Sequence, residues 1–149
     1  MLKILRSKLH FRNDQLNLIT GFYFEVEFPS ERFDLAISVQ SMHHFGFGQK
    51  LSLYKRISRS LVGNGRYIET DYVVSTEIEE KEFRKRYETL KSERNAPDGF
   101  YHFDLPFSID SQKGVLEEAG FWPVRHHERY GNTSVFVAQK PAIEEKLQK

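Results

Sequence analysis

An apolar strand that stops abruptly in polar residues is the feature that most constrains the fold of this chain. Residues 33–39 (FDLAISV) are rich in apolar and β-branched side chains, as expected of a strand buried on both faces. In an open α/β sheet, ligands bind beyond the carboxyl ends of the strands. The sequence therefore predicts a small-molecule site here, formed by the residues that follow at once: Gln40, Ser41, His43 and His44.

The spacing of apolar residues after this strand predicts a parallel crossover. Leu53, Ile57 and Leu61 recur every four residues, which indicates a helix over residues 49–62 with Gly63 as its C-terminal cap. Residues 65–74 then have the pattern of a second strand. A strand, a helix and a strand in this order join as a right-handed crossover between parallel strands.

The segments on either side complete a mixed α/β pattern. Residues 2–12 are predicted to be helical, and residues 16–20 (LNLIT) to form a short strand that ends at Gly21. Thr76 and Glu79 have the spacing of a capping box, which opens a further helix. The rest of the chain is expected to comprise an irregular aromatic segment, a helix and an antiparallel hairpin: residues 95–110, 111–119, and 122–129 with 133–139.

Length and composition narrow the class of protein. A chain of 149 residues fits one domain, expected over residues 1–140 with a polar tail over 141–149. The net charge of +1 creates no field that would recruit nucleic acid or an acidic membrane. The absence of cysteine excludes disulfides and thiol nucleophiles. No run of about 20 apolar residues is present, so a cytoplasmic location is expected.

The order of these elements, with four sequence motifs, resembles the carboxyl-terminal portion of a class I S-adenosylmethionine-dependent methyltransferase. Each motif is weak alone, but together they occur in the order that the family has. Phe33-Asp34-Leu35 opens the fourth strand, and Met42-His43-His44-Phe45 follows it. Residues 61–65 precede the fifth strand. Leu116-Glu117-Glu118-Ala119-Gly120-Phe121 precedes the sixth strand, and residues 134–140 form the seventh.

The resemblance implies a partial Rossmann-like α/β sheet with parallel strands, helices and a closing antiparallel hairpin. It also implies S-adenosylmethionine as the cofactor and a small molecule as the methyl acceptor. The first two strands of the family fold and its G-x-G-x-G cofactor loop have no counterpart in this sequence. We therefore expect a truncated methyltransferase domain that holds the cofactor incompletely when alone.

Loss of those strands would leave the strand over residues 33–39 at the edge of the sheet. An apolar edge strand is a hazard for pairing and aggregation. Three outcomes are open. The chain is a fragment of a longer enzyme, it pairs with another chain along this edge, or the sheet closes in a rearranged fold.

The candidate catalytic residues follow the two buried strands. His43 or His44 would accept a proton from the acceptor, and only one of them is expected to do so, because adjacent side chains on a strand point to opposite faces. Asp71, at the end of the second strand, would orient the acceptor. The competing interpretation is structural, with one histidine packed under the next helix, the other capping its first turn, and Asp71 capping the helix after its strand.

Residues for the cofactor and the acceptor follow from the resemblance. Gly21 and Phe22 stand where the family often has Gly-Asp, and Phe22 can stack on adenine but cannot accept its hydrogen bond. Gln40 and Ser41 complete the cofactor wall. The expected acceptor contacts lie in the irregular segment: Tyr101, His102 and Asp104. No metal is expected, because no two histidines have i, i+4 spacing and no thiolate is present.

Two other functions remain open at this stage. The first is a non-catalytic methyltransferase-like module that forms a homodimer or binds a partner through its open sheet edge. The second is an unrelated small α/β binding protein. The methyl acceptor lies beyond the sequence, because a fold does not determine a substrate.

Overall fold

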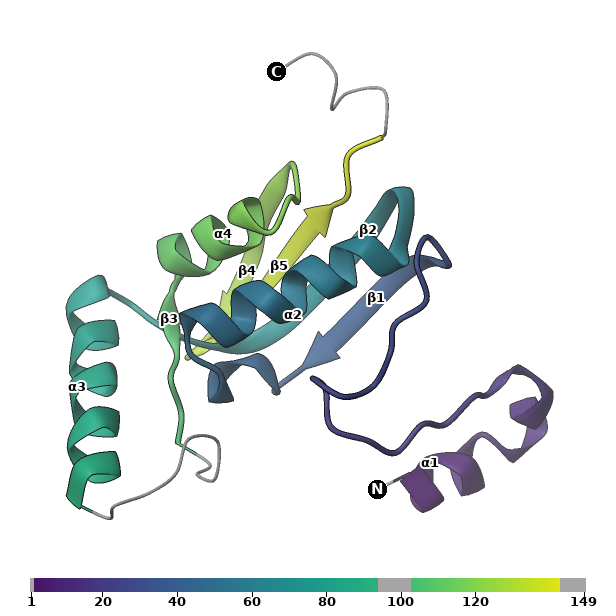
Figure 1. The fold of residues 1–149 in the computed structure, drawn as a ribbon, viewed down its shortest axis with the longest axis horizontal. Coiled ribbons are helices and arrows are strands. Elements are labelled where there is room, and N and C mark those ends of the chain that lie inside the picture. The colour runs from purple at the N-terminus through teal and green to yellow at the C-terminus, as the bar shows by residue number, and fades with distance from the viewer. Residues whose placement is uncertain (1, 94–102, 143–149) are drawn as a thin grey trace.

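The computed structural model describes residues 2–93 and 103–142. Its strands form one sheet in the order β1-β2-β5-β4, with the short β3 beside the end of β2 (Figure 1). β1 pairs with β2 in parallel, and β5 pairs antiparallel with both β2 and β4. The bounds of the strands are β1 Phe33–Val39, β2 Leu61–Val74, β3 Phe107–Ser108, β4 Val124–Tyr130 and β5 Thr133–Gln139.

Helices cover one face of this sheet. α2 (Phe47–Ser60) and α4 (Ile109–Glu118) both cross it on the same side in Figure 1. Because side chains alternate along a strand, every second residue of β2 and β5 points into the layer beneath them. The largest apolar side chains buried there include Tyr54, Tyr67, Phe121 and Phe136. The core therefore lies between the sheet and these two helices.

The remaining helices lie around this two-layer unit. α1 (Leu2–Lys8) and the 3₁₀ helix η1 (His10–Gln15) lie apart from the sheet, and α1 has no buried residue (Figure 1). The single-turn η2 (Met42–His44) joins β1 to α2. α3 (Glu77–Glu93) follows β2. None of the described helices is long and apolar enough to cross a lipid bilayer.

The opposite face of the sheet carries exposed apolar side chains. Leu35, Ile37 and Val39 on β1 are 47%, 61% and 62% exposed. Ile37 lies opposite Ile68 on β2, and Ile68 lies opposite Val137 on β5. Among the described residues no strand pairs with the outer edge of β1. The edge position predicted for this strand is therefore confirmed, whereas the burial on both faces that its composition indicated is wrong.

The crossover, the long helix after residue 76 and the closing hairpin are confirmed. Thr76 Oγ1 accepts a hydrogen bond from the Glu79 backbone N–H (3.2 Å), and Glu79 Oε2 accepts one from the backbone N–H of Ser75 (2.7 Å). The capping interaction therefore reaches one residue further back than the predicted box. Gly131, at a φ of 61°, makes the hairpin turn.

Three predicted local features are wrong. Residues 16–20 form no strand, because no neighbouring strand among the described residues takes up their backbone hydrogen bonds. Gly63 does not cap α2, which ends at Ser60. The backbone is already extended at Leu61, where pairing with Phe33 begins β2. The helix expected over residues 2–12 is broken into α1 and η1.

Candidate active site

Asp71 organises the carboxyl ends of β1 and β2. It lies near the end of β2 on the helix-covered face and is almost fully buried. Its Oδ2 accepts hydrogen bonds from the backbone N–H groups of Met42 (2.5 Å) and His43 (3.0 Å). Its Oδ1 accepts a hydrogen bond from the Tyr72 N–H (2.8 Å) and forms another hydrogen bond with His43 Nδ1. One carboxylate therefore fixes the η2 turn and the imidazole ring of His43.

The charge of Asp71 is stabilised in this setting. Burial alone would raise its pKa, and this is the largest single effect on the group. The hydrogen bond and charge of His43, the Tyr72 N–H and the charge of Lys50 together outweigh burial and lower the pKa. Because the ionised carboxylate only accepts hydrogen bonds, His43 Nδ1 must carry the proton that they share. The other ring nitrogen, Nε2, then keeps its lone pair in the neutral imidazole.

His43 and His44 lie on the same side, not on opposite sides. Their rings are 4.1 Å apart between centroids. The prediction that only one of them reaches the site assumed strand geometry, whereas both residues belong to the single turn of η2. Asp104 completes the group, with Oδ1 3.6 Å from His43 Nε2 and 3.5 Å from His44 Nδ1.

Backbone pairing brings Asp104 to the two histidines from a distant part of the chain. The backbone N–H of Leu105 donates to the carbonyl of His43 at 2.6 Å. A few residues later, β3 pairs with the end of β2, and the Ser108 N–H donates to Glu80 Oε2 at 2.8 Å. These contacts fix the segment that carries Asp104 along the rim of the site. Tyr101 and His102, the other predicted acceptor contacts, lie outside the described residues.

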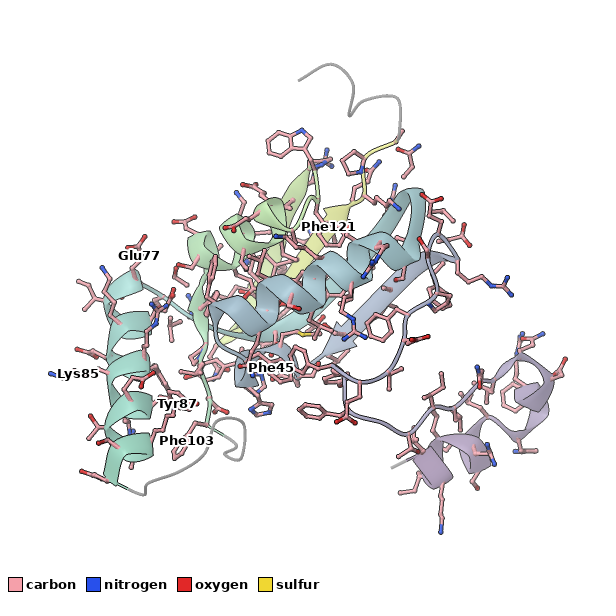
Figure 2. The ribbon with its side chains drawn as sticks, viewed as in Figure 1. Phe45, Glu77, Lys85, Tyr87, Phe103 and Phe121 are labelled. Carbon is pink, nitrogen blue, oxygen red and sulfur yellow. The ribbon has the colours of Figure 1, made fainter. Side chains whose placement is uncertain are left out.

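A cavity of about 200 Å³ opens beside Asp104. Tyr87 on α3 and Phe103 meet edge to face with ring centroids 6.1 Å apart. Figure 2 labels both residues near each other at the α3 side of the molecule. Aromatic walls suit a flat ring, and a guanidinium can pair with an anionic or polar substituent. The cavity is lined by Phe83, Arg86, Tyr87, Phe103 and Asp104.

Buried charged residues lie next to Asp71, and the sequence pattern did not indicate them as a group. Lys50 on α2 donates to Gln112 Oε1 (2.9 Å) and lies 3.7 Å from the centre of the Phe107 ring. Burial lowers the pKa of Lys50 to about 8. Glu69 on β2 accepts a hydrogen bond from the Tyr67 hydroxyl (2.8 Å), and burial raises its pKa to about 7. A lysine at that point of an amphipathic helix is expected on the exposed face, so residue spacing did not indicate that Lys50 is buried.

The predicted cofactor residues lie near the end of β1. Phe22 is 52% exposed and contacts Phe24, which packs on Phe45 just after η2. Gly21 is held close to Val26, where any Cβ would collide with that side chain. The loop is fixed to α2 because Arg56 donates to the carbonyl of Tyr23 at 2.7 Å.

Gln40 and Ser41 form the turn that leads from β1 into η2. Gln40 has a φ of 49°, an uncommon conformation for a residue other than glycine, and its side-chain amide donates to Thr133 Oγ1 at 3.1 Å. The Ser41 hydroxyl makes no capping bond to η2. A hydroxyl and an amide are groups that can hydrogen-bond the adenosine part of S-adenosylmethionine, and the exposed Phe22 ring is one that can stack on its base.

Solved structures with the same fold are numerous, although sequence comparison finds nothing. No family profile matches the chain, and no curated protein matches it in sequence. An O-methyltransferase family 2 protein from Planctomyces limnophilus, solved with apigenin, superposes with a TM-score of 0.67 at 18% identity, over 93% of this chain and 39% of its own. The S-adenosylmethionine-dependent methyltransferase SibL gives 0.68 at 15% identity, over 94% and 40%.

The human N-acetylserotonin methyltransferase, solved with S-adenosylmethionine, gives a TM-score of 0.60 at 17% identity, over 91% of this chain and 37% of its own. The fold is that of a class I methyltransferase, in its carboxyl-terminal portion. The chain spans about 40% of the length of these matched structures. β1, β2, β4 and β5 are the strands that the resemblance assigned as the fourth, fifth, sixth and seventh of the family fold.

Proposed function

We propose that this chain takes part in methyl transfer from S-adenosylmethionine to a hydroxyl group of a small aromatic molecule, as the acceptor-side portion of a truncated methyltransferase domain. The observation that carries the proposal is the His43–Asp71 pair at the carboxyl ends of two neighbouring parallel strands. A buried carboxylate that orients one nitrogen of an imidazole leaves the other nitrogen ready to accept a proton. The methyltransferase fold of the solved neighbours supports the same reaction class.

In this mechanism, bound S-adenosylmethionine supplies an electrophilic methyl group. Asp71 holds His43 with Nδ1 protonated, so that Nε2 faces Asp104 at the rim of the site. Nε2 would accept the hydroxyl proton of the acceptor, while the methyl group passes from the sulfonium sulfur to the acceptor oxygen and S-adenosylhomocysteine is the leaving group. The imidazolium that results is stabilised by the Asp71 carboxylate beside it. General base catalysis of this kind contributes about 10²–10⁴-fold to a rate.

We place the acceptor ring in the cavity beside Asp104. Phe83, Tyr87 and Phe103 would contact its faces, and Arg86 would pair with a polar substituent. The carboxylate of Asp104 lies within reach of both the cavity and His43 Nε2. That one neighbour was solved with apigenin agrees with an aromatic acceptor.

A transfer assay tests this proposal directly. The full chain would be incubated with radiolabelled S-adenosylmethionine and a panel of phenols, and methylated product counted. At saturating donor, which offsets the incomplete cofactor site, we expect measurable transfer by the wild type and a loss of about 10²–10⁴-fold in His43→Ala. His127→Ala, which removes an exposed histidine on β4, serves as the matched control and should retain full activity. No transfer by the wild type, or equal rates in wild type and His43→Ala, would overturn the proposal.

Donor binding has its own readout in a thermal melt with and without saturating S-adenosylhomocysteine. A one-site ligand at 100 times its dissociation constant adds about 2.7 kcal/mol, which raises the midpoint of a domain this size by roughly 5–10 °C. Phe22→Ala should reduce that shift, whereas Phe11→Ala, which removes another exposed ring on η1, should not. A cooperative melt without any shift would favour the non-catalytic module instead.

A further inference from the structure

We propose that His43, His44 and Asp104 form a binding site for a divalent transition-metal ion of the zinc type. Two imidazole nitrogens and a carboxylate oxygen are a donor set that zinc and its first-row neighbours bind. In this chain each residue offers one ligand atom, and the three atoms lie within 4.8 Å of one another. The inference concerns metal binding and stands apart from methyl transfer.

The two distances from Asp104 to the histidine nitrogens are close to those that a zinc ion requires, and all three donor atoms lie within 4.8 Å of one another. With metal–ligand bonds of about 2.0–2.1 Å, a tetrahedral site requires ligand atoms about 3.3–3.4 Å from one another. Asp104 Oδ1 lies 3.6 Å from His43 Nε2 and 3.5 Å from His44 Nδ1. Small side-chain adjustments would therefore bring the three atoms onto one ion.

The residue behind the site also suits a metal centre. A histidine that binds a metal usually donates its second N–H to a carboxylate, which fixes the ring and makes the ligating nitrogen more basic. Asp71 does this for His43 through Oδ1, and its other oxygen holds the backbone of Met42 and His43. The ring of His43 is therefore aimed at Asp104 before any ion arrives.

Three protein ligands leave a fourth position of a tetrahedral ion for water or a ligand hydroxyl. Asp104 lines the aromatic cavity, so this position would lie at the edge of that cavity. A bound ion would take the lone pair of His43 Nε2. Metal binding and proton acceptance by His43 therefore exclude each other, and zinc should inhibit the transfer proposed above.

Cobalt(II) titration of the full chain, with any affinity tag removed and with no methyl donor or acceptor present, tests the site. We expect saturable binding of one ion per chain with visible absorption of a nitrogen- and oxygen-ligated cobalt, and displacement by zinc. Asp104→Ala removes a ligand at an exposed position, where folding tolerates the change, and should weaken binding by at least about tenfold. Asp71→Asn keeps all three ligands but should weaken binding by about 10–100-fold.

A second histidine pair in the chain provides the control. His126 and His127 are also adjacent, but they lie on β4, and the described part of the chain places no third ligand with them. His127→Ala should leave the cobalt affinity unchanged. Absence of saturable binding, or unchanged affinity in Asp104→Ala, would overturn the proposal. Because no methyl donor is involved, a failure of methyl transfer leaves this result unaffected.

Discussion

Two acids of β2 show how one strand face creates opposite electrostatic environments. Glu69 and Asp71 are two residues apart, so both point into the helix-covered layer, and both are almost fully buried. Asp71 is surrounded by N–H donors, and its pKa is lowered. Burial dominates at Glu69, and its pKa is raised to about 7 although Lys50 lies nearby. The same residue class therefore supplies a fixed charge at one position and a titratable group at the other.

The raised pKa of Glu69 predicts a pH dependence of stability. Between about pH 4.5 and 7 the folded chain binds more protons at Glu69 than the unfolded chain does, so the free energy of unfolding falls as the pH rises through this window. Glu69→Gln should remove this fall and make the protein more stable at pH 8 by on the order of 2–3 kcal/mol. Urea unfolding between pH 5 and 8 measures it.

The matched control for that experiment is Glu82→Gln, which changes an exposed acid on α3. Its pH profile should run parallel to that of the wild type. If Glu69→Gln keeps the wild-type slope, burial does not hold the proton on Glu69.

The lowered pKa of Lys50 affects stability in a separate pH window. The free energy of unfolding should rise again as the pH goes from about 8 to 10.5.

The junction between β1 and β2 depends on a close backbone approach at Gly65. Phe33 pairs with Leu61, but Leu35 pairs with Arg66, so the start of β2 bulges away from β1. A Cβ on Gly65 would lie 2.8 Å from the carbonyl oxygen of Val62 and 3.3 Å from that of Asp34. The parallel pairing that sets the two strand ends side by side therefore requires glycine at this position.

Gly65→Ala should destabilise the protein by about 1–3 kcal/mol, because backbone atoms cannot move away as a flexible side chain would. Gly114→Ala, in α4, provides the opposite expectation. Its Cβ would meet no atom within 4 Å, so it should stabilise the helix by about 0.5–1 kcal/mol. Chemical denaturation of both variants measures the two free energies. A neutral Gly65→Ala would show that the bulge relaxes without strain.

The whole molecule is a two-layer unit with a bare apolar sheet face. α2 and α4 cover one side, whereas Leu35, Ile37 and Val39 remain exposed on the other, at the edge of the sheet. An edge strand of this kind offers both backbone hydrogen bonds and apolar surface to a second copy. We therefore predict that the chain self-associates through β1.

Ile37→Lys should reduce this self-association without lowering stability by more than about 0.5 kcal/mol, since Ile37 is 61% exposed. A lysine on an edge strand is a common natural device against such pairing. Sedimentation velocity over a range of concentrations measures the effect. Ile78→Lys, at another exposed position on α3, is the control and should behave like the wild type. Equal sedimentation of wild type and Ile37→Lys at every concentration would contradict the prediction.

The sequence by itself determined the features that arise from local chemistry. The apolar run of β1 and the helical spacing of α2 specify the β1–α2–β2 crossover, the capping residues begin α3, and Gly131 makes the closing hairpin, because each depends on residues close in the chain. The motif order also led to the correct fold. The placing of polar residues at the strand ends identified His43 and Asp71 as neighbours of one site, since parallel strands end at the same edge.

Only the tertiary structure decided which side chains meet. The pairing of His44 with His43 depends on the single turn of η2, and Asp104 joins them through backbone bonds between segments about 60 residues apart, a distance that spacing rules do not cover. The burial of Lys50 and the absence of a strand at residues 16–20 were also decided by the tertiary structure. Burial and strand pairing depend on what the rest of the chain brings alongside, and no local pattern contains that information.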